Sequence, residues 1–183
     1  MGGPTSENRQ DKKNATKTKD LKRARAGLAV LAVGLIISGL TCYFLPAELG
    51  MARRAMEAMS LDTVPLTDEM YAFVVDTEKG VLYIERRHPQ MFLGTDYLGF
   101  AHVILGILFL GAMKGPGRNL WVIEFGVLCC ILVIPAAFIF CYIRGAPLLH
   151  YFVDSSFGVV ALMVMVPVWK SARRLDERAS EKK

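Results

Sequence analysis

Five ionisable side chains lie inside long apolar stretches of this sequence, namely Asp96, His102, Glu124, His150 and Asp154. A charged or imidazole group in such surroundings loses its hydration, so it usually faces a neighbouring helix or a wet cavity rather than lipid. Groups of this kind often handle protons, ligands or ions. These five residues are therefore the first places to look for chemistry.

His102 and Asp154 are the pair that this pattern brings together. Each lies about 10–12 Å inside the same boundary of its own apolar stretch, at ~1.5 Å of helical rise per residue. His102 shares a helical face with Gly99 and Gly106, and Asp154 shares one with Gly158, so each helix can approach a neighbour closely. We therefore expect His102 and Asp154 to touch, either as a hydrogen bond that sets helix register or as a site that handles protons, a ligand or a metal.

Haem and metal sites have less support. Haem ligation by His102 and His150 would need two axial ligands at one depth, but the two residues differ in depth by more than one helical turn. A metal held by His102, His150, Asp154 and Asp96 would need four groups from two helices to converge. We therefore expect no metal and no cofactor. Thiols in apolar helices usually act as small hydrophobes, which is the role expected of Cys42, Cys129, Cys130 and Cys141.

Four apolar stretches must position these groups. Hydrophobic residues make up 53% of the chain and charged residues 21%, and the two classes are segregated along it. A helix needs about 20 mostly apolar residues to cross the ~30 Å hydrocarbon core of a bilayer. The sequence therefore predicts an all-α integral membrane bundle of four transmembrane helices, over residues 27–45, 94–113, 120–143 and 148–169.

The two ends of the chain are strongly basic. Residues 1–26 combine many Lys and Arg with Asn, Thr and Gly, a composition that predicts a disordered cytoplasmic arm attracted to anionic lipids. No aromatic residue is interleaved to stack on bases, so we expect no nucleic-acid partner. Residues 170–183 form a second basic tail after the last span.

The loops predict how the chain is oriented. The loop 114–119 carries Lys114 and Arg118 and would share the cytoplasmic side with both basic ends, since positive residues near spans are retained there. The short loop 144–147 and the longer segment 46–93, in which acidic residues outnumber basic ones, would face outward. Four spans with both termini inside satisfy every loop.

The segment 46–93 is predicted to be an amphipathic helical hairpin rather than a linker. Apolar residues recur at helical spacing on both sides of a break near Pro65, and Thr67 with the acidic residues after it is typical of a helix start. The apolar stripe must be buried on the bundle, in lipid headgroups or against a partner. The lipid bilayer and a membrane protein are therefore the expected partners.

Three stretches of the C-terminal half resemble a group of small uncharacterised bacterial inner-membrane proteins with four spans. They are 94–102 (GTDYLGFAH), 118–126 (RNLWVIEFG), and 143–147 followed by 153–158 (IRGAP and VDSSFG). The group has an aromatic or another apolar residue where this chain has His150. The resemblance implies a bacterial cytoplasmic-membrane location and directs attention, as ligand or proton-site candidates, to Asp96, His102, Arg118, Asn119, Glu124, Arg144 and Asp154.

The sequence is compatible with three functional hypotheses. The leading one is a non-enzymatic scaffold or accessory subunit that acts through its outer hairpin and cytoplasmic tails. The alternative is a small transporter-like or ligand-binding protein that uses an intramembrane site at His102 and Asp154. A membrane-embedded enzyme is less favoured, because the sequence offers no combination of nucleophile, base and oxyanion site.

Overall fold

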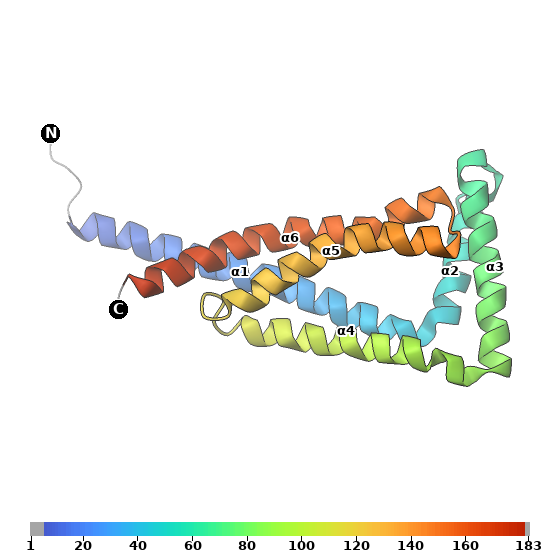
Figure 1. Cartoon of the computed structure of the whole chain (residues 1–183). Coiled ribbons are helices and arrows are strands. Elements are labelled where there is room, and N and C mark those ends of the chain that lie inside the picture. The colour runs from blue at the N-terminus through green and yellow to red at the C-terminus, as the bar shows by residue number, and fades with distance from the viewer. Residues whose placement is uncertain (1–5, 182–183) are drawn as a thin grey trace.

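The computed structural model describes residues 6–181 of the chain, and these residues form helices without any strand (Figure 1). The predicted all-α fold is confirmed. Short 3-10 turns at Cys42–Phe44, Leu61–Thr63 and Pro89–Phe92 link the longer helices. The α-helices are α1 (Ser6–Thr41), α2 (Leu45–Ala58), α3 (Pro65–Arg87), α4 (Leu93–Ala112), α5 (Leu120–Arg144) and α6 (Leu148–Ser180).

Four segments of the described chain are long and apolar enough to cross a membrane, so this is a multi-pass membrane protein. They contain α1, α4, α5 and α6. Apolar side chains cover much of the surface of these helices, with Ile37 56%, Ile107 53% and Val160 59% exposed. Such a surface is suited to lipid, because hydrocarbon chains solvate it without cost.

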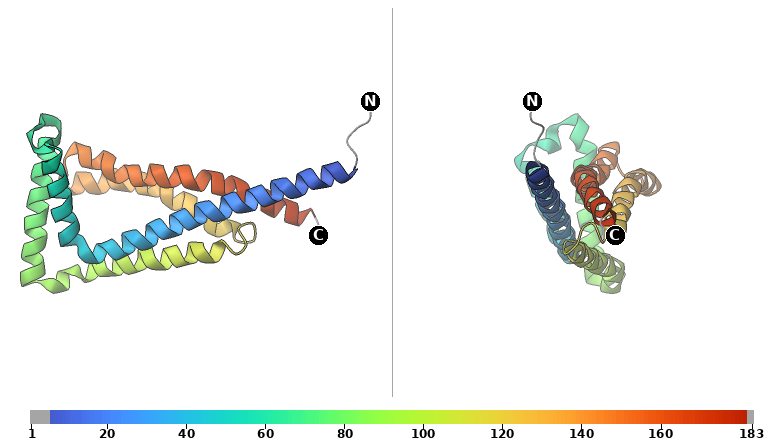
Figure 2. Two further views of the ribbon diagram at one scale, coloured as in Figure 1. Left: turned by 180° about the vertical axis from the view of Figure 1, so that it is seen from behind. Right: turned by 90° about the vertical axis from the view of Figure 1, so that its left-hand side faces the viewer.

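The bundle is built from two helix pairs, α1 with α4 and α5 with α6, which α1 joins. Helix α1 packs along α4 and also against α6, and α5 packs along α6, whereas α4 and α5 hardly touch. Leu28 of α1, Ile123 of α5 and Met165 of α6 are all 0% exposed and form the centre of the core. In Figure 2 the two pairs diverge toward the end of the bundle that lies away from the chain termini.

Glycines allow α1 and α4 to approach closely. A Cβ atom added at Gly99 would lie 2.6 Å from the carbonyl oxygen of Gly39 and 3.0 Å from the Cβ of Cys42. A Cβ at Gly106 would lie 2.9 Å from the carbonyl oxygen of Ala32. Backbone-to-backbone contact of this kind replaces the hydrophobic driving force that lipid cannot supply between helices.

The expectation of a disordered arm over residues 1–26 is wrong for residues 6–26, which belong to α1. From Asp20 onward the reason is a long-range partner, because α6 continues past the predicted span to Ser180 and lies beside this part of α1. Asp20 is only 5% exposed, and its two carboxylate oxygens lie 3.3 Å from Nη1 of Arg174 and 3.3 Å from Nη1 of Arg178. The first five residues of the predicted arm lie outside the described residues.

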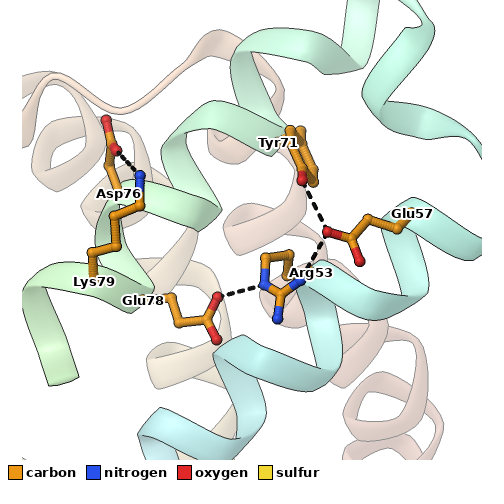
Figure 3. A network of polar contacts seen from close by, with 6 residues as sticks. All are labelled: Arg53, Glu57, Tyr71, Asp76, Glu78 and Lys79. Atoms are coloured by element: carbon orange, nitrogen blue, oxygen red, sulfur yellow. Dashed lines mark hydrogen bonds and ion pairs between the residues drawn. The ribbon is translucent and has the colours of Figure 1, made fainter.

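Helices α2 and α3 form the expected helical hairpin and lie across the end of the bundle that the termini do not reach (Figure 1). Ser60, with φ at 54°, turns the chain between them, and Pro65 begins α3. Arg53 of α2 holds the hairpin closed, because its Nε donates to Glu78 of α3 at 2.7 Å, while its Nη1 donates to Glu57 of its own helix at 2.8 Å (Figure 3). Tyr71 of α3 donates to the same Glu57 oxygen at 2.9 Å.

Acid is expected to loosen this hairpin. Hydrogen bonds from Arg53 and then Tyr71 lower the pKa of the Glu57 carboxyl below its ordinary value. A lowered folded-state pKa means that the carboxylate stabilises the hairpin above the ordinary Glu pKa of about 4.3, and that this stabilisation is lost as the pH falls through the lower folded-state value. The protection factors of the α2 amides, which correct exchange rates for their intrinsic dependence on pH, should therefore fall below about pH 4. The Glu57→Gln variant should lose this pH dependence, and an unchanged profile in that variant would contradict the assignment.

Candidate functional site

The expected contact between His102 and Asp154 is not formed. Helix α4 and helix α6 each pack on α1 rather than along one another. The imidazole Nδ1 of His102 lies 3.0 Å from the carbonyl oxygen of Leu98, one turn earlier in its own helix. The glycine face that His102 shares is covered by α1, since a Cβ added at Gly39 would lie 3.1 Å from the His102 Cβ. The prediction of a His102–Asp154 pair is therefore wrong.

Asp154 instead joins a cluster of three side chains between α5 and α6. Its Oδ2 lies 3.4 Å from Nε2 of His150 and 3.6 Å from Sγ of Cys141. One ligand atom from each of the three residues lies within 4.8 Å of the other two. The structure thus brings together a thiol, an imidazole and a carboxylate, a set that the sequence pattern does not predict.

A tight turn explains how Cys141 reaches the other two. Gly145 adopts φ 65° and ψ 29° at the end of α5, a left-handed conformation that glycine accepts without a Cβ penalty. The amide of Ala146 then donates to the carbonyl of Cys141 at 3.0 Å, and Pro147 precedes the first turn of α6. The last turn of α5 therefore faces the first two turns of α6, where His150 and Asp154 are four residues apart on one face.

The cluster is partly shielded from solvent. Cys141 is 4% exposed, whereas the side chains of His150 and Asp154 are 28% and 40% exposed. The ring of Phe73, from α3 of the hairpin, covers His150 at a centroid distance of 5.0 Å. The Nδ1 atom of His150 is buried and has no hydrogen-bond partner. A buried polar atom without a partner is costly, so packing alone does not explain a histidine here.

The spatial arrangement of the thiol, the imidazole and the carboxylate decides which chemistry they can support. The carboxylate of Asp154 stands next to both the thiol and the imidazole. In cysteine hydrolases the imidazole is bonded to the thiol and the third group orients the imidazole from its far side. The cluster therefore does not match a nucleophile activated by a base. Three donors directed at one point match ligand or cation binding better.

The other candidates are scattered over the bundle and do not form a second site among the described residues. Asp96 lies in the first turn of α4, where the positive end of the helix dipole favours a carboxylate. Glu124 accepts a hydrogen bond from Nε1 of Trp169 at 3.3 Å, which joins α5 to α6. Asn119 donates to the Gly115 carbonyl at 3.0 Å within its own loop. Arg118, in the loop before α5, and Arg144, the last residue of α5, are both exposed.

Comparison with known proteins adds no function to this geometry. No protein-family model, no curated protein and no solved structure matches the chain.

Cys141 is the site residue that the sequence does not single out, because a thiol in an apolar helix is usually inert. The signal that could have found it is its place one turn before Gly145. A glycine turn of a few residues folds α5 back on α6 and brings the last turn of one helix against the first turns of the next.

Proposed function

We propose that this protein is a non-enzymatic scaffold or accessory subunit of the bacterial cytoplasmic membrane, and that its α2–α3 hairpin binds a membrane protein partner. The proposal rests on one observation: α2 and α3 are bonded firmly to each other but only weakly to the bundle. The Arg53 network joins α2 to α3, while the hairpin itself contacts α6 only slightly. A braced element that lies across the end of a bundle offers a preformed surface, and preformed surfaces lose little entropy on binding.

The surface of the hairpin supports a protein partner with an acidic face. A shallow depression on α3 is lined by Lys79, Arg86 and Arg87 together with Leu82 and Tyr83. Tyr83 is 61% exposed, and a tyrosine beside cations is typical of interface surfaces. The depression therefore suits an acidic segment that also carries an apolar side chain to pack on the tyrosine ring.

The proposed orientation has both termini in the cytoplasm and the hairpin outside. It is supported by the distribution of basic residues, because the loop with Lys114 and Arg118 lies toward the same end of the bundle as the termini (Figure 1). In this orientation the α2–α3 hairpin meets the extracytoplasmic parts of other membrane proteins.

The partner can be tested by crosslinking in living cells. A photo-crosslinking amino acid at Tyr83 should yield a discrete protein adduct, whereas the same amino acid at Ile107, which is 53% exposed on the span α4, should yield none. Reversing the charge of Arg86 and Arg87 together to Glu should remove most of the adduct, since an acidic partner face would then be repelled.

Two results would contradict this proposal. Adducts with phospholipid alone at Tyr83 would indicate an anionic lipid in place of a protein. A protein adduct that survives the double charge reversal unchanged would show that the cations of α3 do not select the partner. Correct membrane insertion of each variant, checked by protease protection, is the control.

A further inference from the structure

We propose that Cys141, His150 and Asp154 bind one divalent cation of the zinc type. This inference is independent of the proposed function, since it concerns a cluster beneath the α2–α3 hairpin rather than its surface. The three residues supply a sulfur, a nitrogen and an oxygen donor from the facing ends of α5 and α6. Catalytic and exchangeable zinc sites commonly use three protein ligands and leave the fourth position to water or to another ligand.

Two of the three distances between the donors fit a tetrahedral site. With metal bonds of about 2.3 Å to sulfur and about 2.1 Å to nitrogen and oxygen, tetrahedral angles put nitrogen and oxygen about 3.4 Å apart and sulfur and oxygen about 3.6 Å apart. The structure has 3.4 Å between Nε2 of His150 and Oδ2 of Asp154, and 3.6 Å between Sγ of Cys141 and the same oxygen. The ligand atoms of the third pair, Cys141 and His150, lie within 4.8 Å of one another, so an approach of at most about 1.2 Å between sulfur and nitrogen completes the tetrahedral set.

The alternative is a cluster held only by hydrogen bonds. The contact between His150 and Asp154 is long for such a bond, since N–H to O distances in proteins are centred near about 2.9 Å. In addition, Nδ1 of His150 is buried without a partner, so a neutral ring leaves one buried nitrogen unsatisfied whichever tautomer it adopts.

The donor types select the metal class. A thiolate, an imidazole and a carboxylate together suit Zn²⁺, whereas Mg²⁺ and Ca²⁺ prefer oxygen ligands alone. On binding, the Cys141 thiol releases its proton to water and the thiolate sulfur bonds the ion, while His150 binds through its neutral lone pair and Asp154 as carboxylate. No electron is transferred, and the charge of the ion is neutralised by the two anionic ligands.

Cobalt titration tests the site directly. The full-length protein, reduced, stripped of metal and placed in lipid nanodiscs, should bind one Co²⁺ per chain with a thiolate-to-cobalt charge-transfer absorption that Zn²⁺ abolishes by competition. Cys141→Ser should remove this absorption. His150→Phe and Asp154→Asn should each weaken binding by at least about 100-fold, because loss of a residue that only supports a metal ligand already costs about 10–100-fold.

Cys42→Ser is the matched control, since it removes another thiol from a helix end outside the cluster and should leave the spectrum unchanged. Circular dichroism establishes that each variant is folded, and His150→Phe keeps an aromatic ring against Phe73. The proposal is overturned if the folded native protein binds no Co²⁺, or if the absorption persists in Cys141→Ser. It is also overturned if Cys42→Ser abolishes the absorption as fully.

Discussion

Gly99→Ala should lower the free energy of unfolding of the bundle by about 2–3 kcal/mol, the upper range for forcing an added group into a packed core. The new Cβ would lie 2.6 Å from the Gly39 carbonyl oxygen, which belongs to the backbone of α1 and cannot rotate away. Helix α4 would have to move outward from α1, and the packing on either side of Gly99 would loosen. Reversible unfolding in mixed micelles of mild detergent and dodecyl sulfate measures this loss.

Gly34→Ala is the matched control for this prediction. Gly34 lies in the membrane-spanning part of α1, and a Cβ added there meets nothing within 4 Å. It should leave stability unchanged or raise it by up to about 1 kcal/mol, because alanine is the better helix former. If the two alanine variants had equal stability, α1 and α4 would not be in backbone contact at Gly99.

Asp20→Leu should lower the free energy of unfolding by about 2 kcal/mol. This value lies between the small contribution of an exposed ion pair and the roughly 3–5 kcal/mol lost when one partner of a buried ion pair is removed. Asp20 is buried, but the side chains of Arg174 and Arg178 are 47% and 33% exposed and can turn to water when the carboxylate is removed. The loss should appear as faster amide exchange in α1 before Ala24 and in α6 after Ala172.

Glu177→Gln provides the comparison for Asp20. Glu177 accepts from Arg173 at 3.1 Å, but both side chains are more than half exposed and lie four residues apart on one helix. Removing the Glu177 charge should lower the free energy of unfolding by no more than about 0.5 kcal/mol. Equal exchange in Asp20→Leu and in the native protein would show that the N-terminal part of α1 is held by other contacts.

The spans could be predicted from the sequence because the thickness of a bilayer imposes a length on each apolar run. The helix α5 begins at Leu120 as expected, and α4 begins at Leu93, one residue before the expected boundary. Which spans touch could not be predicted in the same way. The glycines near His102 correctly indicated a close neighbour, but small residues do not identify that neighbour, and it is α1 rather than α6.

Long-range pairing also explains the two other differences. The composition of residues 6–26 predicts disorder for the segment alone, yet Asp20 finds two arginines more than 150 residues away in α6. The surroundings of Cys141 in the sequence are those of an inert apolar thiol, yet the glycine turn at Gly145 places it beside Asp154. In both cases the decisive contact joins two segments, and the sequence pattern of neither segment predicts the other as its partner.

The position of α1 between α4 and α6 has a consequence for how the protein is made. Helix α1 leaves the ribosome before α6, one of its two main partners, which is completed only at Ser180. At a synthesis rate of about 5–20 residues per second, roughly 7–30 s pass between the completion of α1 and that of α6. During that interval the Gly27 and Leu28 face of α1, which finally rests on Val168, must be covered by lipid or by the insertion machinery.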